Sequence, residues 1–223
     1  MSMLEKRSTT QLTRLGRLTD VVFAIVIWRI FMLLPRPEDY GTKWDTVSAM
    51  LQEEWFSFLF VLLATAIVII YWLQNTSMLG NLKKTNKVHT TISIFQLVFV
   101  LLFLYAITSG VILGAGTDSR IFESVTAMMI GVMSWVGWFY AMHKADLLDP
   151  ELSKQEAEHI LQKNLAEPVT AVITIPFALV GPVAWELSWF LYPFIKHLFS
   201  RFNSRDQSTW EVTGRYPKHP DRK

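Results

Sequence analysis

The chain has 223 residues, of which 51% are hydrophobic and only 18% charged, whereas a soluble domain has about 25% charged residues. A net charge of +2 gives no basic excess for nucleic acid, and the absence of cysteine excludes disulfides and thiolate metal sites. Apolar runs of about 20 residues, separated by short polar stretches, predict an all-α membrane protein in the lipid bilayer.

We predict a membrane domain of six transmembrane helices over residues 1–200 and a polar cytoplasmic tail over residues 201–223. The first helix spans 15–34 and stops at Pro35-Arg36-Pro37, because proline cannot continue a helix. A polar, acidic loop follows. The next three predicted helices are 55–73, 91–113 and 121–142.

The last apolar stretch, 168–199, would be roughly 48 Å long as one helix, which is too long for a single crossing. We therefore expect Gly181-Pro182 to divide it into two crossings, and one long tilted helix is the alternative. The polar insert before it, 143–167, is predicted to hold a short amphipathic surface helix.

Basic residues near the predicted membrane ends give the orientation. Lysines and arginines precede the first helix, follow the second at Lys83, Lys84 and Lys87, and follow the sixth at Arg201 and Arg205. Because cytoplasmic loops carry an excess of Lys and Arg, both termini are expected in the cytoplasm.

Enzyme signatures are missing from the sequence. It has no phosphate-binding loop, no dinucleotide glycine fingerprint, no zinc-binding His-Glu-x-x-His and no nucleophile elbow. The five histidines are too scattered for a metal cluster. We therefore expect no enzyme, cofactor or metal site. The Thr-Val-Gly-Tyr-Gly loop, whose carbonyls select potassium in ordinary potassium channels, is also missing.

The first helix is unusual because it carries charge. Arg14, Arg17 and Asp20 lie at its start and Arg29 lies deep in it. A charge near the bilayer centre costs at least about 2.5–3.5 kcal/mol unless it meets a partner or water, so such residues are functional candidates. Alternatively, Arg17 and Asp20 form an intrahelical pair and Arg14 anchors the helix at the headgroups.

Residues 14–20, followed by the apolar run 21–25, resemble the signature Arg-x-x-x-Phe-Ser-Asp of the transmembrane protein 175 family. These proteins are potassium channels of endosomes and lysosomes with shorter prokaryotic relatives. The signature positions are occupied by Arg14, Leu18, Thr19 and Asp20, with Leu in place of Phe and Thr in place of Ser.

The resemblance implies a homotetramer whose first helices line a central pore, in a prokaryotic plasma membrane. The signature residues would anchor that helix to its neighbours, and the family's apolar pore constriction maps onto Ile25. Potassium would be a permeant ion and no cofactor is implied. The six-crossing layout of the resemblance extends over the whole chain.

Geometry offers two interpretations of this helix. At 100° per residue, one stripe holds Leu18, Val21, Ile25, Trp28 and Met32. From spacing alone, such a stripe faces lipid or packs on other helices. Around a tetramer axis it would instead form apolar rings that exclude water, with Val21, Trp28 and Met32 next to Ile25.

Arg29 lies about 40° from the axis of this stripe. Four arginines in the pore would repel potassium, so we expect Arg29 to turn into a helix interface and to form a buried ion pair with Glu186. Removing one member of such a pair leaves a buried charge.

The leading hypothesis is a leak-type channel for monovalent cations that is permeable to potassium and modestly selective for it. The alternative is a proton channel or proton-coupled transporter, with Asp20, His89 and Glu186 as relay groups. Against a transporter, the sequence shows no inverted repeat. A membrane scaffold without transport is the third possibility.

Overall fold

A computed structural model describes residues 3–36, 44–114, 116–144 and 146–199. Within these ranges the regular structure is helical, apart from an isolated antiparallel bridge between Leu82 and Leu148. The helices, in chain order, are α1 (Met3–Phe31), α2 (Val47–Glu53), α3 (Trp55–Gly80), α4 (Lys87–Leu113), α5 (Thr117–His143), α6 (Lys154–Asn164), α7 (Ala166–Val180) and α8 (Pro182–Ser188). A 3-10 turn (Trp189–Leu191) follows α8, and 192–199 are again helical. The predicted all-α class is confirmed.

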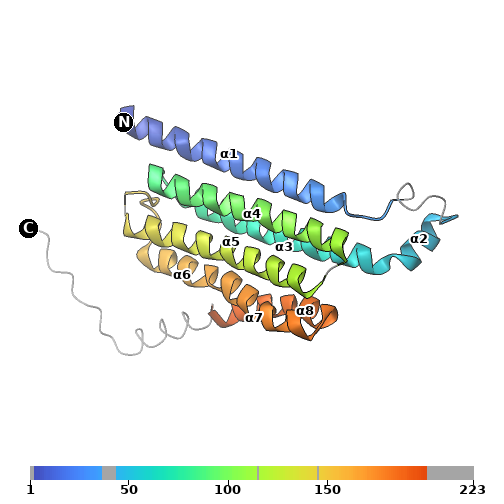
Figure 1. Ribbon diagram of the computed structural model, residues 1–223. Coiled ribbons are helices and arrows are strands. Elements are labelled where there is room, and N and C mark those ends of the chain that lie inside the picture. The colour runs from blue at the N-terminus through green and yellow to red at the C-terminus, as the bar shows by residue number, and fades with distance from the viewer. Residues whose placement is uncertain (1–2, 37–43, 115, 145, 200–223) are drawn as a thin grey trace, which may run out of the picture.

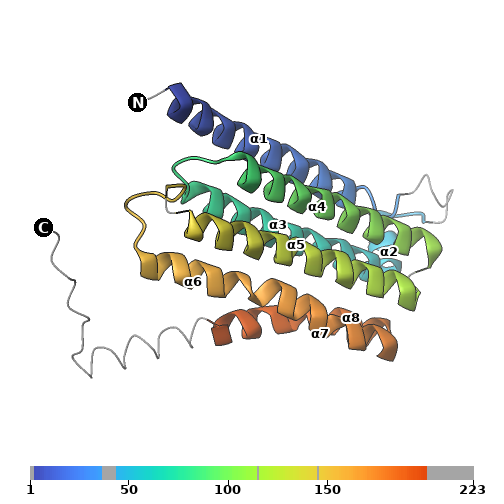
Figure 2. The same ribbon diagram turned by 60° about the vertical axis from the view of Figure 1, so that its left-hand side comes forward.

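The long helices lie side by side in an elongated bundle (Figures 1 and 2). At one edge, α1 covers α3 and α4, and in the middle α5 packs between α4 and α7. The short α8 returns along α7 at the opposite edge. Among the described residues, this arrangement leaves one side of α1 without a neighbouring helix.

Four helical stretches are long and apolar enough to cross a membrane: α3, α4, α5 and the run Lys154–Val180. The expected membrane protein is thereby confirmed. Although α1 is long, it is not among the four, since Arg14, Arg17, Asp20 and Arg29 interrupt its apolar half. The bilayer-crossing role of α1 and of the segment after Gly181 remains a proposal.

Helix α1 begins at Met3, well before the predicted start at residue 15, and ends at Phe31. Its polar first half contains hydrogen bonds from side chains to the backbone of the same helix: the hydroxyls of Thr10 and Thr13 donate to the carbonyls of Lys6 and Thr9. The apolar pattern therefore identified only the apolar second half of α1, although Gln11 and Leu12 in the first half also contact the bundle.

The predicted surface helix in the polar insert is present as α6, and it starts with a capping box between Ser153 and Glu156. It is, however, part of the bundle. Ala157 is 1% exposed, and its carbonyl accepts a hydrogen bond from Trp138 Nε1 on α5 at 2.9 Å. Because Leu165 keeps a helical conformation, α6 leads directly into α7. The helical run therefore begins at Lys154, well before the predicted residue 168.

The predicted break at Gly181-Pro182 is present, and a single long helix is excluded. Gly181 has φ 150°, a conformation that residues with a Cβ rarely adopt. Pro182 then opens α8, where its missing N–H is not needed. The chain turns back along α7 at this point (Figure 2).

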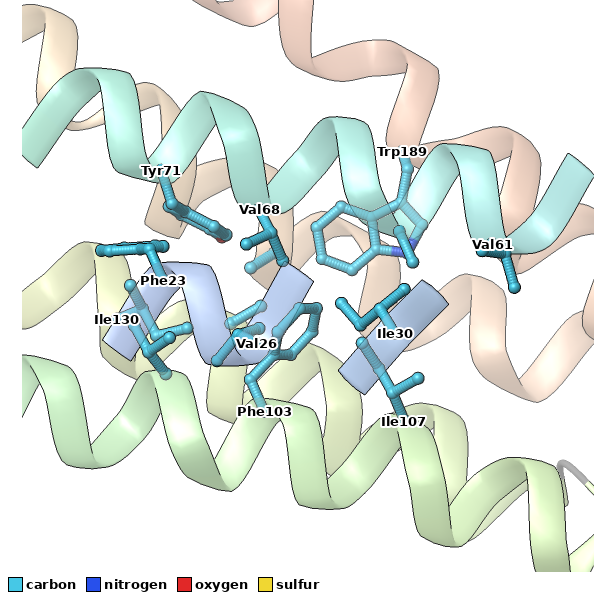
Figure 3. Close-up of a cluster of buried hydrophobic side chains, with 14 of the residues drawn as sticks. Phe23, Val26, Ile30, Val61, Val68, Tyr71, Phe103, Ile107, Ile130 and Trp189 are labelled. Carbon is cyan, nitrogen blue, oxygen red and sulfur yellow. The ribbon is translucent and has the colours of Figure 1, made fainter. Parts of the chain in front are cut away.

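The main core gathers side chains from the inner faces of several helices, including Phe23, Val26 and Ile30 of α1 and Phe103 of α4 (Figure 3). Trp189, in the 3-10 turn, reaches the same cluster. Lipid tails are as apolar as these side chains, so close packing, more than removal from water, stabilises such contacts in a membrane.

Two sets of sequence predictions lie outside the described residues. One is the part of the acidic loop that holds Glu38, Asp39 and Lys43. The other is the polar tail 201–223, with Arg201 and Arg205.

Candidate functional site

Helix α1 has one deeply buried face. Leu15, Thr19, Phe23, Val26 and Ile30 are each at most 3% exposed and follow one another at intervals of three or four residues. This spacing places them on one side of the helix, against α3 and α4. The opposite side of α1 therefore faces away from α3 and α4.

That opposite side carries the predicted stripe. Leu18, Val21, Ile25 and Trp28 are 45%, 55%, 49% and 60% exposed in the single chain. With Arg14 in front of them, they advance in alternating steps of four and three residues, the spacing of a helix that packs along a partner helix. We call Leu18, Val21, Ile25 and Trp28 the α1 stripe.

Charged side chains flank the α1 stripe. Arg17, Asp20 and Arg29 are also exposed on this half of the helix. Bare charges on a lipid-facing surface at membrane depth are expensive, and intramembrane charges almost always face a bundle interior or a water-filled space. The composition of this half of α1 therefore favours a covered or hydrated surface over a lipid-facing one.

Asp20 is held by a neighbouring helix. Its Oδ1 accepts a hydrogen bond from Trp72 Nε1 of α3 at 3.0 Å. Thr19, beside it, is buried, and its hydroxyl donates to the Leu15 carbonyl at 3.0 Å within α1. Of the signature residues, Asp20 thus joins two helices while Thr19 fits a hydroxyl into the packed face.

The other signature residues, Arg14 and Leu18, have exposed side chains. In the part of the chain that is described, Arg14 makes no hydrogen bond or ion pair. The contact of this end of α1 with α4 comes from Gln11, whose Nε2 donates to Thr90 Oγ1 at 3.2 Å. Sequence reasoning did not single out Gln11.

His89 belongs to the same corner of the bundle. It is 3% exposed, and its Nδ1 lies 2.9 Å from Thr85 Oγ1, which in turn lies 3.2 Å from Thr90 Oγ1. A hydroxyl network therefore accounts for this buried histidine, and over the described residues no hydrogen bond links it to Asp20.

The predicted ion pair of Arg29 with Glu186 is not formed within one described chain. Arg29 is exposed on α1, whereas Glu186 lines a cavity together with Arg120 and Glu123 of α5. Arg120 lies one residue before the predicted helix 121–142 and Glu123 lies inside it, and neither was singled out from the sequence. Sequence reasoning therefore missed the arginine that is available to Glu186.

Met32 also departs from the predicted stripe. It follows the end of α1, its side chain is partly buried, and it lines the same cavity. Its sulfur lies 2.8 Å from the Arg36 guanidinium. The Met32 N–H still donates to the Trp28 carbonyl at 3.1 Å, so the difference from the α1 stripe lies in the Met32 side chain, which is partly buried against Arg36.

Metal binding finds no support in the described ranges, where no three His, Cys, Asp or Glu side chains are grouped closely enough to hold an ion. Along α1, the residues that the structure brings together with neighbouring helices are apolar or hydrogen-bonded. The fold and site thus define a helical membrane protein whose first helix presents an apolar stripe with flanking charges.

Comparison with known proteins agrees with this description. Residues 14–103, from the signature in α1 through most of α4, match the model of the family described as endosomal/lysosomal potassium channel TMEM175. No curated protein matches the chain. The family resemblance that the first helix carries is thereby confirmed.

A solved structure has the same fold. It is the crystal structure of a variant of the potassium channel MtTMEM175 in complex with a nanobody–MBP fusion protein. It is 19% identical, with a TM-score of 0.55, and the match covers 86% of this chain and 93% of that chain. The chain therefore corresponds in extent to nearly the whole of that polypeptide.

Proposed function

We propose that this chain forms a leak-type, potassium-permeable cation channel, a homotetramer in which four copies of α1 surround the ion path. The family match and the common fold with a potassium channel support the class of function. The observation that carries the proposal is the α1 stripe, an exposed apolar seam on the helix that also carries the family signature.

In the proposed assembly, the α1 stripes of the four subunits face one another across the axis. Ile25 lies in the middle of the stripe and forms the constriction, with Val21 and Trp28 on either side of it. A ring of branched apolar side chains can stop ions by excluding water. Met32 is left out of the proposed lining, because its side chain lies against the Arg36 guanidinium and lines the cavity at the end of α1.

Each subunit would then cross the membrane six times. The four apolar stretches supply four crossings, and α1 and the segment 182–199 supply the others. Both termini would lie in the cytoplasm, in the plasma membrane of a prokaryote. Selectivity for potassium over sodium would be modest, since the sequence has no carbonyl filter loop.

A proton relay is less well supported. Asp20 is bonded to Trp72, His89 to Thr85, and Glu186 lines a cavity past the far end of α1. Among the residues that the structure describes, no chain of hydrogen bonds connects these three groups. Asp20 and His89 each have a local hydrogen-bond partner that accounts for them without proton transfer.

The test is ion flux into liposomes that contain the purified protein, with wild type compared to Ile25→Asn. A polar ring at the constriction should hydrate the path and raise the flux of both potassium and sodium by about tenfold or more. The matched control is Ile69→Asn, at an exposed isoleucine of α3 (38% exposed) outside the α1 stripe. It should leave flux unchanged.

Two results would count against the proposal. Wild-type protein that carries no potassium would remove the channel function. Equal flux in wild type and Ile25→Asn would leave a channel but would place its constriction elsewhere. The oligomeric state of the same preparation, measured by native mass spectrometry, should be a tetramer.

A further inference from the structure

A second site lies away from the α1 stripe. Near the end of α1, a cavity of about 470 Å³ opens between the start of α3, the end of α4, the start of α5 and α8. Its walls include Leu33, Phe56, Phe60, Val111 and Trp185. Its size falls within the range of about 300–1,000 Å³ that is typical of small-molecule sites.

The polar groups of the cavity come from a cluster of three charged residues. Arg120 and Glu123, on α5, are 8% and 6% exposed, and Glu186, on α8, is partly buried. Arg120 Nη2 is engaged with the protein, because it donates to Thr117 Oγ1 at 3.1 Å and to the Ala178 carbonyl at 3.4 Å. The cluster thus places two carboxyl groups beside one guanidinium, and it would carry a surplus negative charge with both acids ionised.

The structure makes room for the Glu123 carboxylate. A Cβ added to Gly110, on α4, would lie 2.8 Å from Glu123 Oε1, so the glycine permits this close approach. In the described residues, no hydrogen bond or ion pair of the chain reaches the carboxylates of Glu123 and Glu186. A buried carboxylate without such a contact is an acceptor available to a ligand.

Two properties therefore meet in one space: apolar walls and a polar cluster in which carboxyl groups outnumber the guanidinium two to one. A small inorganic cation would use only the polar groups and would leave the apolar walls wet. An anion would face two carboxylates. An ammonium group on an apolar body matches both surfaces, because it can donate to the carboxylates while its hydrocarbon part contacts Phe56 and Phe60.

We propose that this cavity binds an organic monocation, an amine whose ammonium group meets Glu123 and Glu186 and whose apolar body fills the space between α1, α3 and α8. The site is separate from the α1 stripe, and its occupancy does not depend on the channel function. It is a ligand site that neither the family match nor the related fold assigns.

The test uses three probes that share one apolar body: phenylbutylamine, phenylbutanol and phenylbutyrate. Their affinities for the purified full chain in detergent are measured by ligand-observed NMR titration. The amine should bind tightest and the carboxylate weakest, with a difference of about tenfold or more between the two. Equal affinity for the amine and the carboxylate would overturn the proposal.

Three variants sharpen the result. Glu123→Gln removes one of the two carboxylates that would pair with the ammonium group, so the preference for amine over carboxylate should fall by about tenfold while phenylbutanol binds as before. Ser57→Phe places a large ring on the cavity wall and should weaken all three probes. Glu151→Gln, at an exposed acid in the loop before α6, is the control for adsorption to the micelle and should change nothing.

If Glu123→Gln does not fold, Ser57→Phe and the three-probe comparison on wild type still decide the matter. An unchanged preference in folded Glu123→Gln, or undiminished binding by Ser57→Phe, would show that the probes bind elsewhere. Either result would refute the site.

Discussion

The hydrogen bond from Trp72 Nε1 to Asp20 Oδ1 predicts how firmly α1 is held against α3. Trp72→Phe keeps an aromatic ring but removes the N–H donor, and Asp20→Ala removes the acceptor. A hydrogen bond to a charged group contributes about 1.5–3 kcal/mol. Because Asp20 is exposed in the single chain, screening reduces this to about 1 kcal/mol.

For a protein of this size, a loss of about 1 kcal/mol lowers Tm by about 2–4 °C. The assay is thermal unfolding of the purified protein in detergent, followed by tryptophan fluorescence and by loss of the oligomer peak. Asp20→Asn keeps an oxygen acceptor and should lose less than Asp20→Ala. Trp55→Phe, at a 60% exposed tryptophan at the start of the same helix, is the control and should leave Tm unchanged.

The double variant is the stricter test. If the two side chains act through one hydrogen bond, Asp20→Ala combined with Trp72→Phe should destabilise the protein by less than the sum of the two single changes. Fully additive losses would refute the contact. The same variants separate the functions, because Asp20→Asn should still conduct potassium as a channel, whereas a proton relay through Asp20 would stop.

Two further changes test the packing of the bundle. Gly131→Ala on α5 should strongly destabilise the fold, because its new Cβ would lie 2.6 Å from the Pro168 side chain and 2.9 Å from the Pro168 backbone nitrogen of α7. Gly137→Ala is the control and should be tolerated, because the nearest neighbour of its new Cβ is at 3.5 Å. Equal Tm values for the two variants would contradict the way in which α5 and α7 cross. Ser124→Ala should lower the unfolding free energy by about 1–3 kcal/mol, since it leaves the buried indole N–H of Trp185 without its 2.9 Å acceptor. Trp185→Phe in the Ser124→Ala background should then add little beyond the effect of its packing change. Fully additive losses would argue against this hydrogen bond.

The helices themselves were largely predictable, because apolar length and polar interruptions are local properties of the sequence. Helix α4 begins four residues before the predicted start at 91 and ends at Leu113, just before Gly114, a glycine in the left-handed conformation that is expected of a helix cap. The reversal at Gly181-Pro182 follows from the same logic. The start of α1 at Met3 has no such signal and was missed. The capping box of Ser153 and Glu156 marks the start of α6 at Lys154, but the continuation of α6 into α7 was not predicted.

The exposed side of α1 could also be predicted, since a fixed helical period places Val21, Ile25 and Trp28 together. The residues that each charged side chain lies beside could not be predicted. Glu186 lies with Arg120 in a cavity, although Arg29 was the arginine expected from depth along the helices. The position of a residue along its helix gives its depth in the membrane. Which two charged residues meet also depends on how each helix is rotated about its axis, and packing decides that rotation.

The central claim, that α1 helices of several subunits line the ion path, is tested most directly by cysteine accessibility, since the natural chain has no cysteine. Potassium flux through liposomes is measured for Ile25→Cys before and after addition of a water-soluble, positively charged methanethiosulfonate reagent, with Ile69→Cys as the control. We expect modification to block flux in Ile25→Cys and to leave Ile69→Cys unaffected. Flux that persists in fully modified Ile25→Cys would contradict a path lined by α1.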